Sequence, residues 1–429
     1  MNIGIIGSGH VGLVTAACFA DLGNHVICMD QDVKKIQLLK KGGVPIYEPG
    51  LSELLKKNRL KKRLIFTTSI REAVKFAEIL FICVGTPPRE GGDADLTAVE
   101  HVAYSIAACL TKYRLIVEKS TVPVETGMQL KRTIAENIRK NVPFDVASNP
   151  EFLREGNAVY DFFNPDRIVV GTESKRAEKI LKDVYKPFRA PIIITDIRSA
   201  ELIKHASNSF LAMKISFINM VGQICKKVGA DVMRVAEGIG ADTRISKSFL
   251  NPGIGFGGFC FPKDLSAFIR IGEKLGVPCN LLREVLNVND AQKINFVKLV
   301  EQSLWNLSGK TVGVLGLSFK PDTEDMRFAP SIDIINKLQE DGVKIKAYDP
   351  QAIAEAKKVF KGIQYAKNPY DAVKGADAML VLTEWNEFRE LDLKKVKKLL
   401  KRPIVIDGRN IYSPAEMEKL GFRYYSIGR

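Results

Sequence analysis

The first thirty residues carry the pattern that most constrains the fold. A short apolar run, IGIIG (3–7), leads into Gly7-Ser8-Gly9-His10-Val11-Gly12, and the LVTAACFADLG that follows has apolar residues at helical spacing. A second apolar run, NHVICMD (24–30), ends at Asp30, 23 residues after Gly7. This order of strand, glycine-rich turn, helix, strand and acid is typical of a βαβ unit that binds a dinucleotide.

Each glycine of the GxGxxG turn has a physical task. Gly7 permits the tight turn, Gly9 lets a pyrophosphate approach the backbone, and Gly12 lets helix and strand pack closely. The start of the helix then offers free N–H groups to the phosphates. A carboxylate at Asp30 would accept hydrogen bonds from a ribose diol and repel a 2′-phosphate, so we expect NAD rather than NADP. The alternative is an ordinary glycine-rich turn between a strand and a helix.

Further apolar runs alternate with helical stretches up to about residue 198. They are LIFTTS (64–69), EILFICVGTP (78–87) and RLIVEKSTVP (114–123). Such alternation predicts a parallel, doubly wound sheet. Thr86 and Thr121 then fall at the carboxyl ends of strands, where ligands bind in sheets of this kind.

The pattern becomes helical in the middle of the chain. Residues 199–230 keep helical spacing for about thirty residues without a proline, and 281–305 form a second long helical stretch. A helix this long needs burial on more than one side, so we expect a domain connector or a subunit interface.

From Gly309 the opening pattern recurs. TVGVLGLSF (311–319) is similar to NIGIIGSGH, and VKIKAYDP (343–350) places Asp349 where Asp30 stood. The second turn lacks the full fingerprint, because Phe319, Lys320 and Pro321 stand in its place. We therefore expect this part to bind a nucleotide in another way, or not at all.

The predicted fold class is α/β, with two Rossmann-like doubly wound domains joined by a central helical domain that contains a long helix. The expected bounds are 1–198 for the NAD-binding domain, 199–305 for the helical dimerisation and active-site domain, and 306–429 for a second Rossmann-like domain. Because the long helix needs a partner surface, a homodimer through 199–230 is expected.

The net charge of +15 raises the question of nucleic-acid binding. The basic runs are KKNRLKKR (56–63) and KKVKKLLKR (394–402), and the second has leucines at helical spacing. No aromatic residues are interleaved with this charge. A solvated helix face is therefore favoured over a nucleic-acid partner, and a basic protein also attracts phosphorylated ligands.

Cysteine usage and hydropathy point to a reducing compartment. The chain has seven cysteines, no CxxC pair and four histidines, so neither a disulfide framework nor a metal site is expected. The first residues have no basic stretch typical of a signal peptide, and no apolar run is long enough to cross a bilayer. We expect a cytoplasmic enzyme or binding protein with no membrane partner.

Cys260 lies in GFGGFCFPKD (255–264), which shows neither helical nor strand periodicity. Gly257 and Gly258 allow close approach of a ligand, and Lys263 and Asp264 supply positive charge and a proton acceptor. Cys260 is interpreted as a nucleophile, against the alternatives of a packed thiol or a metal ligand. Such a thiol would hold an aldehyde as a thiohemiacetal, which a second NAD oxidises to a thioester. The remaining cysteines lie in or beside apolar runs and are expected to be packed: Cys18, Cys28, Cys83, Cys109, Cys225 and Cys279.

Lys204 and Asn208 are spaced i, i+4 on the predicted long helix and so share one face. A lysine and an amide directed to one point suit a developing oxyanion. The alternative is a solvated lysine beside an asparagine in the middle of a helix.

Taken together, these segments resemble the UDP-glucose 6-dehydrogenases of the nucleotide-sugar dehydrogenase superfamily over essentially the whole chain. The motifs that carry the resemblance are GSGHVG (7–12), VGTP (84–87), KSTVP (119–123), NPEFLREG (149–156), AELIKHASNSFLAMKISFIN (200–219), FLNPGIGFGGFCFPKD (249–264), LGLSFKPDTEDMR (315–327) and DGRN (407–410). The resemblance implies oxidation of UDP-glucose to UDP-glucuronate with two NAD and one water.

The resemblance also implies residue roles. Cys260 would be the nucleophile, Lys204 and Asn208 would stabilise the oxyanion, and Asp264 would assist proton transfer or the hydrolytic water. Thr121 and Glu151 would hold the water or act as the base. NAD would contact Gly7, Gly9, Val11, Gly12, Asp30, Lys35, Thr86, Thr121, Glu151, Lys263 and Arg327. The substrate would contact Phe152, Leu153, Arg154, Lys204, Asn208, Phe249, Leu250, Asn251, Gly253, Gly257, Phe319, Lys320 and Arg409, together with Arg244 reaching in from a partner subunit.

One position departs from the family pattern. Phe259 stands where a small serine is common. Its ring either packs away from the site or narrows the pocket and dries the thiol, which would raise the pKa of Cys260. The alternative functions are dehydrogenation of GDP-mannose or UDP-N-acetylmannosamine, and a catalytically silent regulator that binds a nucleotide sugar. Because Cys260, Lys204, Asn208 and Asp264 are all present, an enzyme is favoured.

Overall fold

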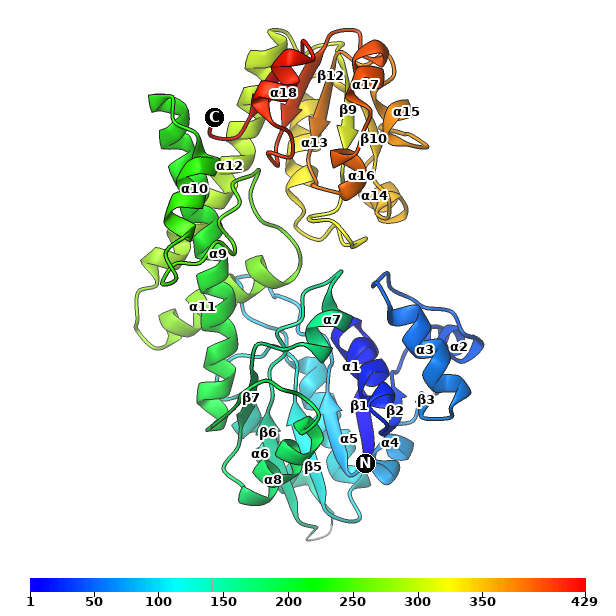
Figure 1. The fold of residues 1–429 in the computed structure, drawn as a ribbon. Coiled ribbons are helices and arrows are strands. Elements are labelled where there is room, and N and C mark those ends of the chain that lie inside the picture. Colours follow the sequence, from blue (N-terminus) through cyan, green and yellow to red (C-terminus); the bar gives the residue numbers. More distant parts are fainter. Residues whose placement is uncertain (140–141) are drawn as a thin grey trace. The chain divides into compact units, whose positions relative to one another are not determined.

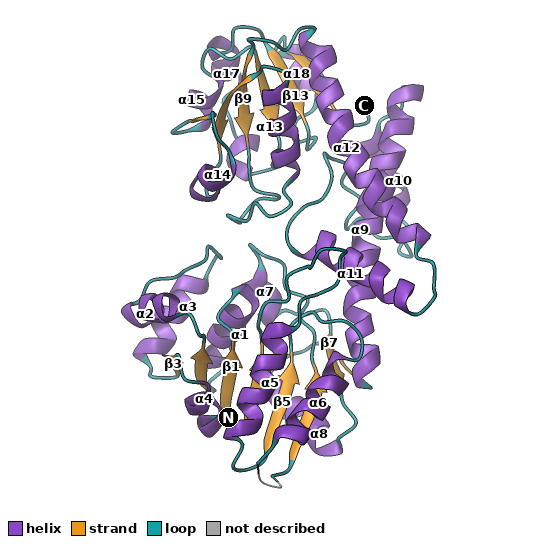
Figure 2. Cartoon of the chain, turned by 180° about the vertical axis from the view of Figure 1, so that it is seen from behind, coloured by secondary structure: helices purple, strands orange, loops and turns teal. Residues whose placement is uncertain are grey.

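The computed structural model describes residues 1–139 and 142–429, which divide into two compact units. Unit 1 comprises Met1–Ser207 with Ser266–Val277, and unit 2 comprises Asn208–Leu265 with Pro278–Arg429. Each unit is built on one sheet with helices packed against it (Figures 1 and 2). Among the described residues, no helix has the length and apolar character needed to span a bilayer.

Unit 1 contains an eight-stranded sheet in the order β3-β2-β1-β4-β5-β6-β7-β8. The strands are β1 (Asn2–Ile6), β2 (His25–Met29), β3 (Leu64–Thr67), β4 (Ile79–Ile82), β5 (Arg114–Glu118), β6 (Phe144–Ser148), β7 (Ile168–Gly171) and β8 (Ile192–Thr195). Neighbouring strands are parallel except β6 and β7, which pair antiparallel at Ser148 and Gly171. The chain order reverses between β1 and β4, which is the point where ligands bind in doubly wound sheets.

Helices cover both faces of this sheet. They are α1 (His10–Asp21), α2 (Val33–Lys41), α3 (Leu51–Leu60), α4 (Ile70–Phe76), α5 (Thr97–Cys109), α6 (Thr126–Asn137), α7 (Ala158–Phe163) and α8 (Lys175–Tyr185). Successive residues of β4 point to opposite faces of the sheet: Phe81 belongs to the core under α1 and Ile82 to the core under α5. The inner strands β4 and β5 are buried on both sides, which explains why they read as continuous apolar runs.

Unit 2 contains a six-stranded, all-parallel sheet in the order β11-β10-β9-β12-β13-β14. Its strands are β9 (Thr311–Leu315), β10 (Lys344–Tyr348), β11 (Gln364–Tyr365), β12 (Ala378–Val381), β13 (Ile404–Asp407) and β14 (Arg423–Ser426). The helices packed on it include α13 (Pro330–Glu340), α14 (Ile353–Val359), α15 (Pro369–Val373), α16 (Asn386–Arg389), α17 (Leu393–Leu399) and α18 (Pro414–Lys419). This strand order is that of a Rossmann fold, which confirms the second Rossmann-like domain.

The central segment is helical, as expected. Its helices are α9 (Ile197–Val228), α10 (Val232–Gly240), α11 (Cys260–Lys274) and α12 (Asn280–Leu304). Within unit 2, the Ser216 hydroxyl of α9 donates to the Val285 carbonyl of α12 at 2.7 Å, and Gln223 bonds to Gln292 at 2.9 Å. The two long helices lie within about two residues of their predicted ends. The expected three-part division at 198 and 305 stays a prediction.

One local expectation was wrong. Cys260 does not lie in irregular chain but is the first residue of α11. The proline that follows at 262 falls in the first turn, where a missing N–H costs little, so it does not interrupt the helix. The pattern was obscured because glycines at 255, 257 and 258 lie just before the helix.

Candidate active site

In unit 1 the glycine turn has the geometry that a dinucleotide requires. Gly7 has φ +102°, and a Cβ there would lie 2.4 Å from the Cys83 carbonyl oxygen. A Cβ on Gly12 would lie 2.0 Å from the Gly7 carbonyl oxygen, whereas one on Gly9 would meet nothing within 4 Å. The turn is therefore closed by protein at two glycines and open at the third. The open position precedes α1, whose first N–H groups can receive a pyrophosphate.

Hydrogen bonds hold the Asp30 carboxylate against this turn. Its Oδ2 accepts the Ser8 N–H at 2.8 Å and the Ser8 hydroxyl at 2.7 Å, and lies 3.4 Å from Lys35 Nζ. Burial opposes ionisation, but hydrogen bonds from Asp32 and Ser8 and the charge of Lys35 hold the pKa of Asp30 below its ordinary value. The carboxylate thus remains an acceptor, as binding of a ribose diol requires. Gly7, Gly9, Gly12, Asp30 and Lys35 fit NAD.

A second carboxylate that the sequence patterns did not reveal also supports this turn. The buried side chain of Glu48 accepts the N–H groups of Gly156 and Ala158 at 2.7 and 2.8 Å, and its Oε2 lies 2.8 Å from His10 Nε2. Burial would lower the pKa of His10, but Glu48 and the nearby carboxylate of Glu155 raise it overall. Glu48 therefore links the start of α1 to the NPEFLREG loop. Its position in YEPG gave no recognisable signal in the sequence.

Thr86 and Thr121, each predicted at the carboxyl end of a strand, lie together. The Thr86 hydroxyl donates to the Thr121 carbonyl at 2.8 Å. On the other side of the same loop, His205 Nε2 of α9 lies 2.9 Å from the Val122 carbonyl oxygen. The segment KSTVP is thereby fixed between strand β4 and helix α9.

Two buried carboxyl groups hold the flanks of this loop. Glu118 accepts the Ser120 N–H at 2.8 Å, and burial raises its pKa to about 8. Glu201 accepts the N–H groups of Glu125 and Gly127, both at 2.7 Å, and burial raises its pKa to about 7. Both carboxyl groups position the backbone rather than the substrate, and no motif in the sequence had indicated them.

Lys204 and Glu151 form a buried ion pair in unit 1. Lys204 Nζ lies 3.0 Å from Glu151 Oε1, and both side chains are almost fully buried. Glu151 Oε2 accepts the Leu153 N–H at 2.6 Å, which fixes the loop that follows. Lys204 Nζ also lies 5.4 Å from the ring centroid of Phe152. The structure thus brings together four residues that were predicted to share a site.

Arg154, from the same loop, is held by a carboxylate. It forms a bidentate pair with Asp161, whose oxygens lie 2.6 and 2.9 Å from the guanidinium nitrogens. Arg154 also donates its backbone N–H to Asp161 at 2.9 Å. Asp161 therefore fixes the position of the Arg154 guanidinium, which was predicted to contact the substrate.

In unit 2 the residues around Cys260 form a compact polar cluster. Asp264 is fully buried and lies one helical turn after Cys260 on α11. Its Oδ2 accepts from the Asn208 amide at 2.6 Å, and its Oδ1 lies 2.5 Å from Lys263 Nζ. The half-buried thiol stands at the first residue of a 15-residue helix, where the helix dipole favours a thiolate.

The ring of Phe259 packs against cations. The guanidinium carbon of Arg327 lies 4.3 Å from the ring centroid, and Lys263 Nζ lies 5.6 Å from it. Arg327 is itself held by Asp325, at 2.7 and 2.9 Å. Both cations were predicted to contact NAD, so Phe259 supports them. The large residue at this position thus has a structural partner in Arg327.

The glycines before Cys260 are required by close packing. Gly258 has φ +80°, and a Cβ there would lie 2.7 Å from the Phe319 ring; one on Gly257 would lie 2.3 Å from the Phe328 carbonyl oxygen. Arg409 donates to the carbonyls of Gly255 and Phe319, both at 3.2 Å. Three segments therefore meet at the carboxyl end of the second sheet: the glycine-rich loop before Cys260, the turn after β9 and the DGRN segment.

Asp349 lies in the second sheet where Asp30 lies in the first, but hydrogen bonds from the protein occupy both of its carboxylate oxygens. Its Oδ2 accepts the N–H groups of Leu317 and Ser318 at 2.7 and 3.1 Å, and its Oδ1 accepts those of Gln351 and Ala352. It is buried, whereas Asp30 is partly exposed. The second Rossmann-like domain thus uses its acid to hold the turn after β9.

The remaining predicted substrate residues are distributed more widely. Arg244 is exposed and pairs with Asp242 at 2.7 Å. Phe249 has φ +64° and lies 6.1 Å from the Phe261 ring, centroid to centroid. The Gly253 N–H is held by Asn219 at 2.8 Å. Of the predicted catalytic set, unit 1 holds Thr121, Glu151 and Lys204, and unit 2 holds Asn208, Cys260 and Asp264.

Comparison with known proteins covers the whole chain. Residues 1–189, 198–291 and 313–414 match, respectively, the NAD binding, central and UDP binding domains of the UDP-glucose/GDP-mannose dehydrogenase family. The chain is 48% identical to the UDP-glucose 6-dehydrogenase TuaD of Bacillus subtilis (strain 168), over 100% of this chain and 93% of that protein.

Two solved structures are similar over their full length. A UDP-glucose dehydrogenase from Pyrobaculum islandicum has a TM-score of 0.93 and 40% identity, covering 100% of this chain and 97% of that one. A UDP-D-ManNAc dehydrogenase from Pyrococcus horikoshii has a TM-score of 0.88 and 27% identity, covering 100% and 99%. The protein therefore belongs to the UDP-glucose/GDP-mannose dehydrogenase family.

Proposed function

We propose that this protein oxidises UDP-glucose to UDP-glucuronate with NAD, and that Cys260 holds the sugar between two oxidations. The relatives named as UDP-glucose dehydrogenases are more similar to this chain than the UDP-D-ManNAc enzyme, at 48% and 40% against 27% identity. This difference supports UDP-glucose over the N-acetylated sugar. The overall change is the loss of two hydrides and two protons and the addition of one water, which converts the C6 alcohol to a carboxylic acid.

The groups that hold NAD come from unit 1. Gly9 and the first N–H groups of α1 would receive the pyrophosphate, and Asp30 the ribose diol. Thr86 and Thr121 lie at the carboxyl ends of strands, where the rest of the cofactor is expected. Bound NAD supplies hydride acceptance, once in each oxidation.

The first oxidation requires a base for the proton of the C6 hydroxyl. Glu151 and Thr121 are the proposed groups, either directly or through a water that they hold. The ion pair with Lys204 at 3.0 Å keeps Glu151 oriented for this task. The proton passes either to the Glu151 carboxylate or to a water that Glu151 and Thr121 hold.

The aldehyde then reacts with Cys260. The Sγ–C6 bond forms, the carbonyl π electrons move to O6, and Lys204 and Asn208 donate hydrogen bonds to that oxygen. Proton return to O6 gives a thiohemiacetal. Transfer of the second hydride from C6 to NAD, with the O6 proton passing back to the base, leaves a thioester, so two electrons leave in each oxidation.

Hydrolysis releases the acid. Water adds to the thioester carbonyl, its proton passes to Asp264, and the C6–S bond breaks to restore the thiolate. Asp264 is fully buried and already accepts hydrogen bonds from Asn208 and Lys263. These donors hold its carboxylate in place, as a group that receives a proton from water requires.

The observation that carries the proposal is the placement of Cys260 at the first residue of α11, one turn before the buried Asp264. The test counts NADH formed per UDP-glucose consumed. Wild-type protein should give two, and Cys260→Ala should form no UDP-glucuronate, because no thioester can form. Cys109→Ala, a half-buried cysteine of unit 1, is the matched control and should still give two.

Three results would contradict parts of the proposal. Two NADH per sugar at the wild-type rate in Cys260→Ala would exclude the covalent route while leaving the overall reaction intact. Faster turnover with GDP-mannose or UDP-N-acetylmannosamine than with UDP-glucose would replace the substrate. Binding of nucleotide sugar without turnover would favour a regulator.

We also propose a homodimer through α9. Within unit 2 this helix carries apolar side chains on one face that are between 43 and 70 % exposed: Phe210, Phe217, Met220, Ile224 and Val228. Their spacing of three, four and seven residues aligns them in one stripe. Contiguous exposed apolar surface of this kind is typical of an interface, and a two-fold contact would cover both copies at once. The exposed Arg244 would then be available to the partner's site.

A cytoplasmic location is proposed on chemical grounds. The chain has seven cysteines without a CxxC pair, and the proposed reaction depends on a reduced Cys260. The proposed division of labour follows the expected bounds: 1–198 for NAD, 199–305 for the active-site helices and dimer contact, and 306–429 for the nucleotide sugar.

A further inference from the structure

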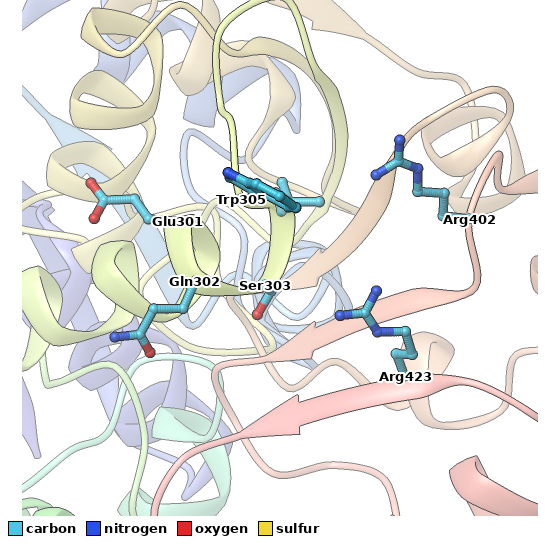
Figure 3. A pocket seen from close by; sticks show the side chains of 7 residues that line it. Glu301, Gln302, Ser303, Trp305, Arg402 and Arg423 are labelled. Atoms are coloured by element: carbon cyan, nitrogen blue, oxygen red, sulfur yellow. The ribbon is translucent and has the colours of Figure 1, made fainter.

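A pocket of about 560 Å³ lies in unit 2 at the end of α12 (Figure 3). It is lined by Glu301, Gln302, Ser303, Leu304, Trp305, Arg402 and Arg423. In Figure 3 the guanidinium groups of Arg402 and Arg423 project from the strand side towards Trp305, whereas the side chains of Glu301 and Gln302 extend to the opposite side. None of these residues belongs to the proposed active site.

The pocket and the expected substrate residues occupy opposite ends of the same sheet. Arg402 precedes β13, and Arg423 is the first residue of β14, so both mark the amino ends of parallel strands. Phe319 and Arg409 follow β9 and β13, at the carboxyl ends. A strand of four or five residues separates the two ends, so the pocket is distinct from the substrate site.

Trp305 is held in an unfavourable state. Its side chain is 97 % exposed, and its backbone has φ +65° and ψ −53°. A bulky residue at positive φ is rare and costs free energy, and exposure of an indole forfeits its burial. The backbone is fixed by the Trp305 N–H, which donates to the Glu301 carbonyl at 2.9 Å. Strained, exposed aromatic residues of this kind occur at ligand clamps.

The two arginines present uncompensated positive charge. Arg423 donates to the Tyr425 hydroxyl at 2.9 Å and lies 6.0 Å from that ring. Within the part of the chain that the structure describes, neither Arg402 nor Arg423 forms an ion pair with a carboxylate within 4.0 Å. Two guanidinium groups beside one exposed indole suit a ligand that joins an anion to a planar ring.

We propose that this pocket binds a nucleoside phosphate, with the base stacked on Trp305 and the phosphate paired with Arg402 and Arg423. A volume of about 560 Å³ is that of a small-molecule site. Inorganic phosphate alone would account for the arginines but not for the exposed indole. An acidic protein segment would engage the charges without requiring a flat aromatic surface.

The two tryptophans of the chain allow a direct test. Trp385 is 6 % exposed, and its indole N–H lies 3.3 Å from Asp349 Oδ2 at the carboxyl end of the sheet. Trp385→Phe leaves Trp305 as the only indole, and Trp305→Phe leaves Trp385. UMP, AMP and inorganic phosphate are titrated into each variant, with excitation at the red edge of tryptophan absorption, where nucleotides absorb little.

Saturable quenching by UMP or AMP is expected in Trp385→Phe, because a stacked base quenches the indole. Arg402→Ala/Arg423→Ala in that background should weaken the apparent affinity at least about tenfold, since two charge-assisted pairs are lost. Arg71→Ala/Arg189→Ala removes the same charge from exposed positions of unit 1 and should change affinity less than about twofold. Phosphate should compete without quenching.

Calorimetry on protein with both tryptophans gives a second measurement if Trp385→Phe unfolds. UMP should occupy one site fewer in Arg402→Ala/Arg423→Ala than in wild type. Quenching that stays linear in nucleotide concentration, or equal affinity in the arginine and control variants, would overturn the proposal. Saturation by poly-glutamate but not by UMP or AMP would overturn it in favour of an acidic protein segment.

Discussion

Substitutions in the buried ion pair of Lys204 and Glu151 should affect stability and catalysis in different ways, so the two effects can be measured separately. In Lys204→Met the carboxylate keeps the Leu153 N–H on one oxygen but loses the ammonium 3.0 Å from the other. Removal of one partner of a buried ion pair costs about 3–5 kcal/mol, because the remaining charge is uncompensated. With a urea slope of about 2–3 kcal/mol/M, the midpoint of unfolding should fall by roughly 1–2.5 M.

The double variant Lys204→Met/Glu151→Gln removes both charges. We expect it to recover most of the lost stability, since a neutral amide in the same volume leaves no buried charge. Turnover should not recover. If Lys204 stabilises the oxyanion, kcat should stay about 10²–10³ below wild type in single and double variants.

The assays are urea unfolding followed by far-ultraviolet circular dichroism, and kcat and KM for UDP-glucose from initial rates. Lys57→Met is the matched control, because Lys57 pairs with Asp21 at 2.7 Å but remains half exposed. It should cost less than about 1 kcal/mol and leave kcat unchanged. An unchanged urea midpoint in Lys204→Met would refute the uncompensated-charge reasoning. Wild-type kcat in the double variant would refute the role assigned to Lys204.

Three further predictions follow from contacts elsewhere. Asp30→Ala should raise KM for NAD about tenfold or more with little change for UDP-glucose, because the carboxylate faces the glycine turn; equal changes in both KM values would contradict this role. Glu118 has its pKa raised by burial to about 8, so its contribution to stability is present below pH ~4.5 and is lost as pH rises through about 8. The urea midpoint of Glu118→Gln relative to wild type should therefore increase between pH ~5 and ~8, and a constant difference would count against the raised pKa. Phe217→Glu should give monomers in sedimentation, whereas Tyr160→Glu, an exposed aromatic of unit 1, should not; dimers in both variants would exclude α9 as the interface.

Several elements were predictable because their causes are local. The long helices were expected at 199–230 and 281–305 and lie at Ile197–Val228 and Asn280–Leu304. Apolar spacing sets such helices, and neighbouring residues carry the whole signal. The recurrence of the opening pattern after Gly309 likewise indicated a second Rossmann-like sheet, whose strand order confirms it.

Other features were not predictable because their partners are distant in sequence. Glu48 binds the N–H groups of Gly156 and Ala158, more than a hundred residues away, and no short motif encodes such a contact. The start of α11 at Cys260 was missed because glycines directly before a helix hide its first turn. Phe259 was ambiguous until its ring was seen against Arg327, 68 residues later.

The sequence by itself determined the fold class, the dinucleotide turn and the family. Glycine sterics, apolar periodicity and fixed motif spacing act over a few residues, so they can be read directly from the chain. Only the tertiary structure decided which polar groups are already satisfied. It placed Asp349 inside its turn while leaving Asp30 partly exposed, and it left Trp305 exposed in a pocket that Arg402 and Arg423 also line. Burial and pairing depend on how distant segments pack, which no local pattern specifies.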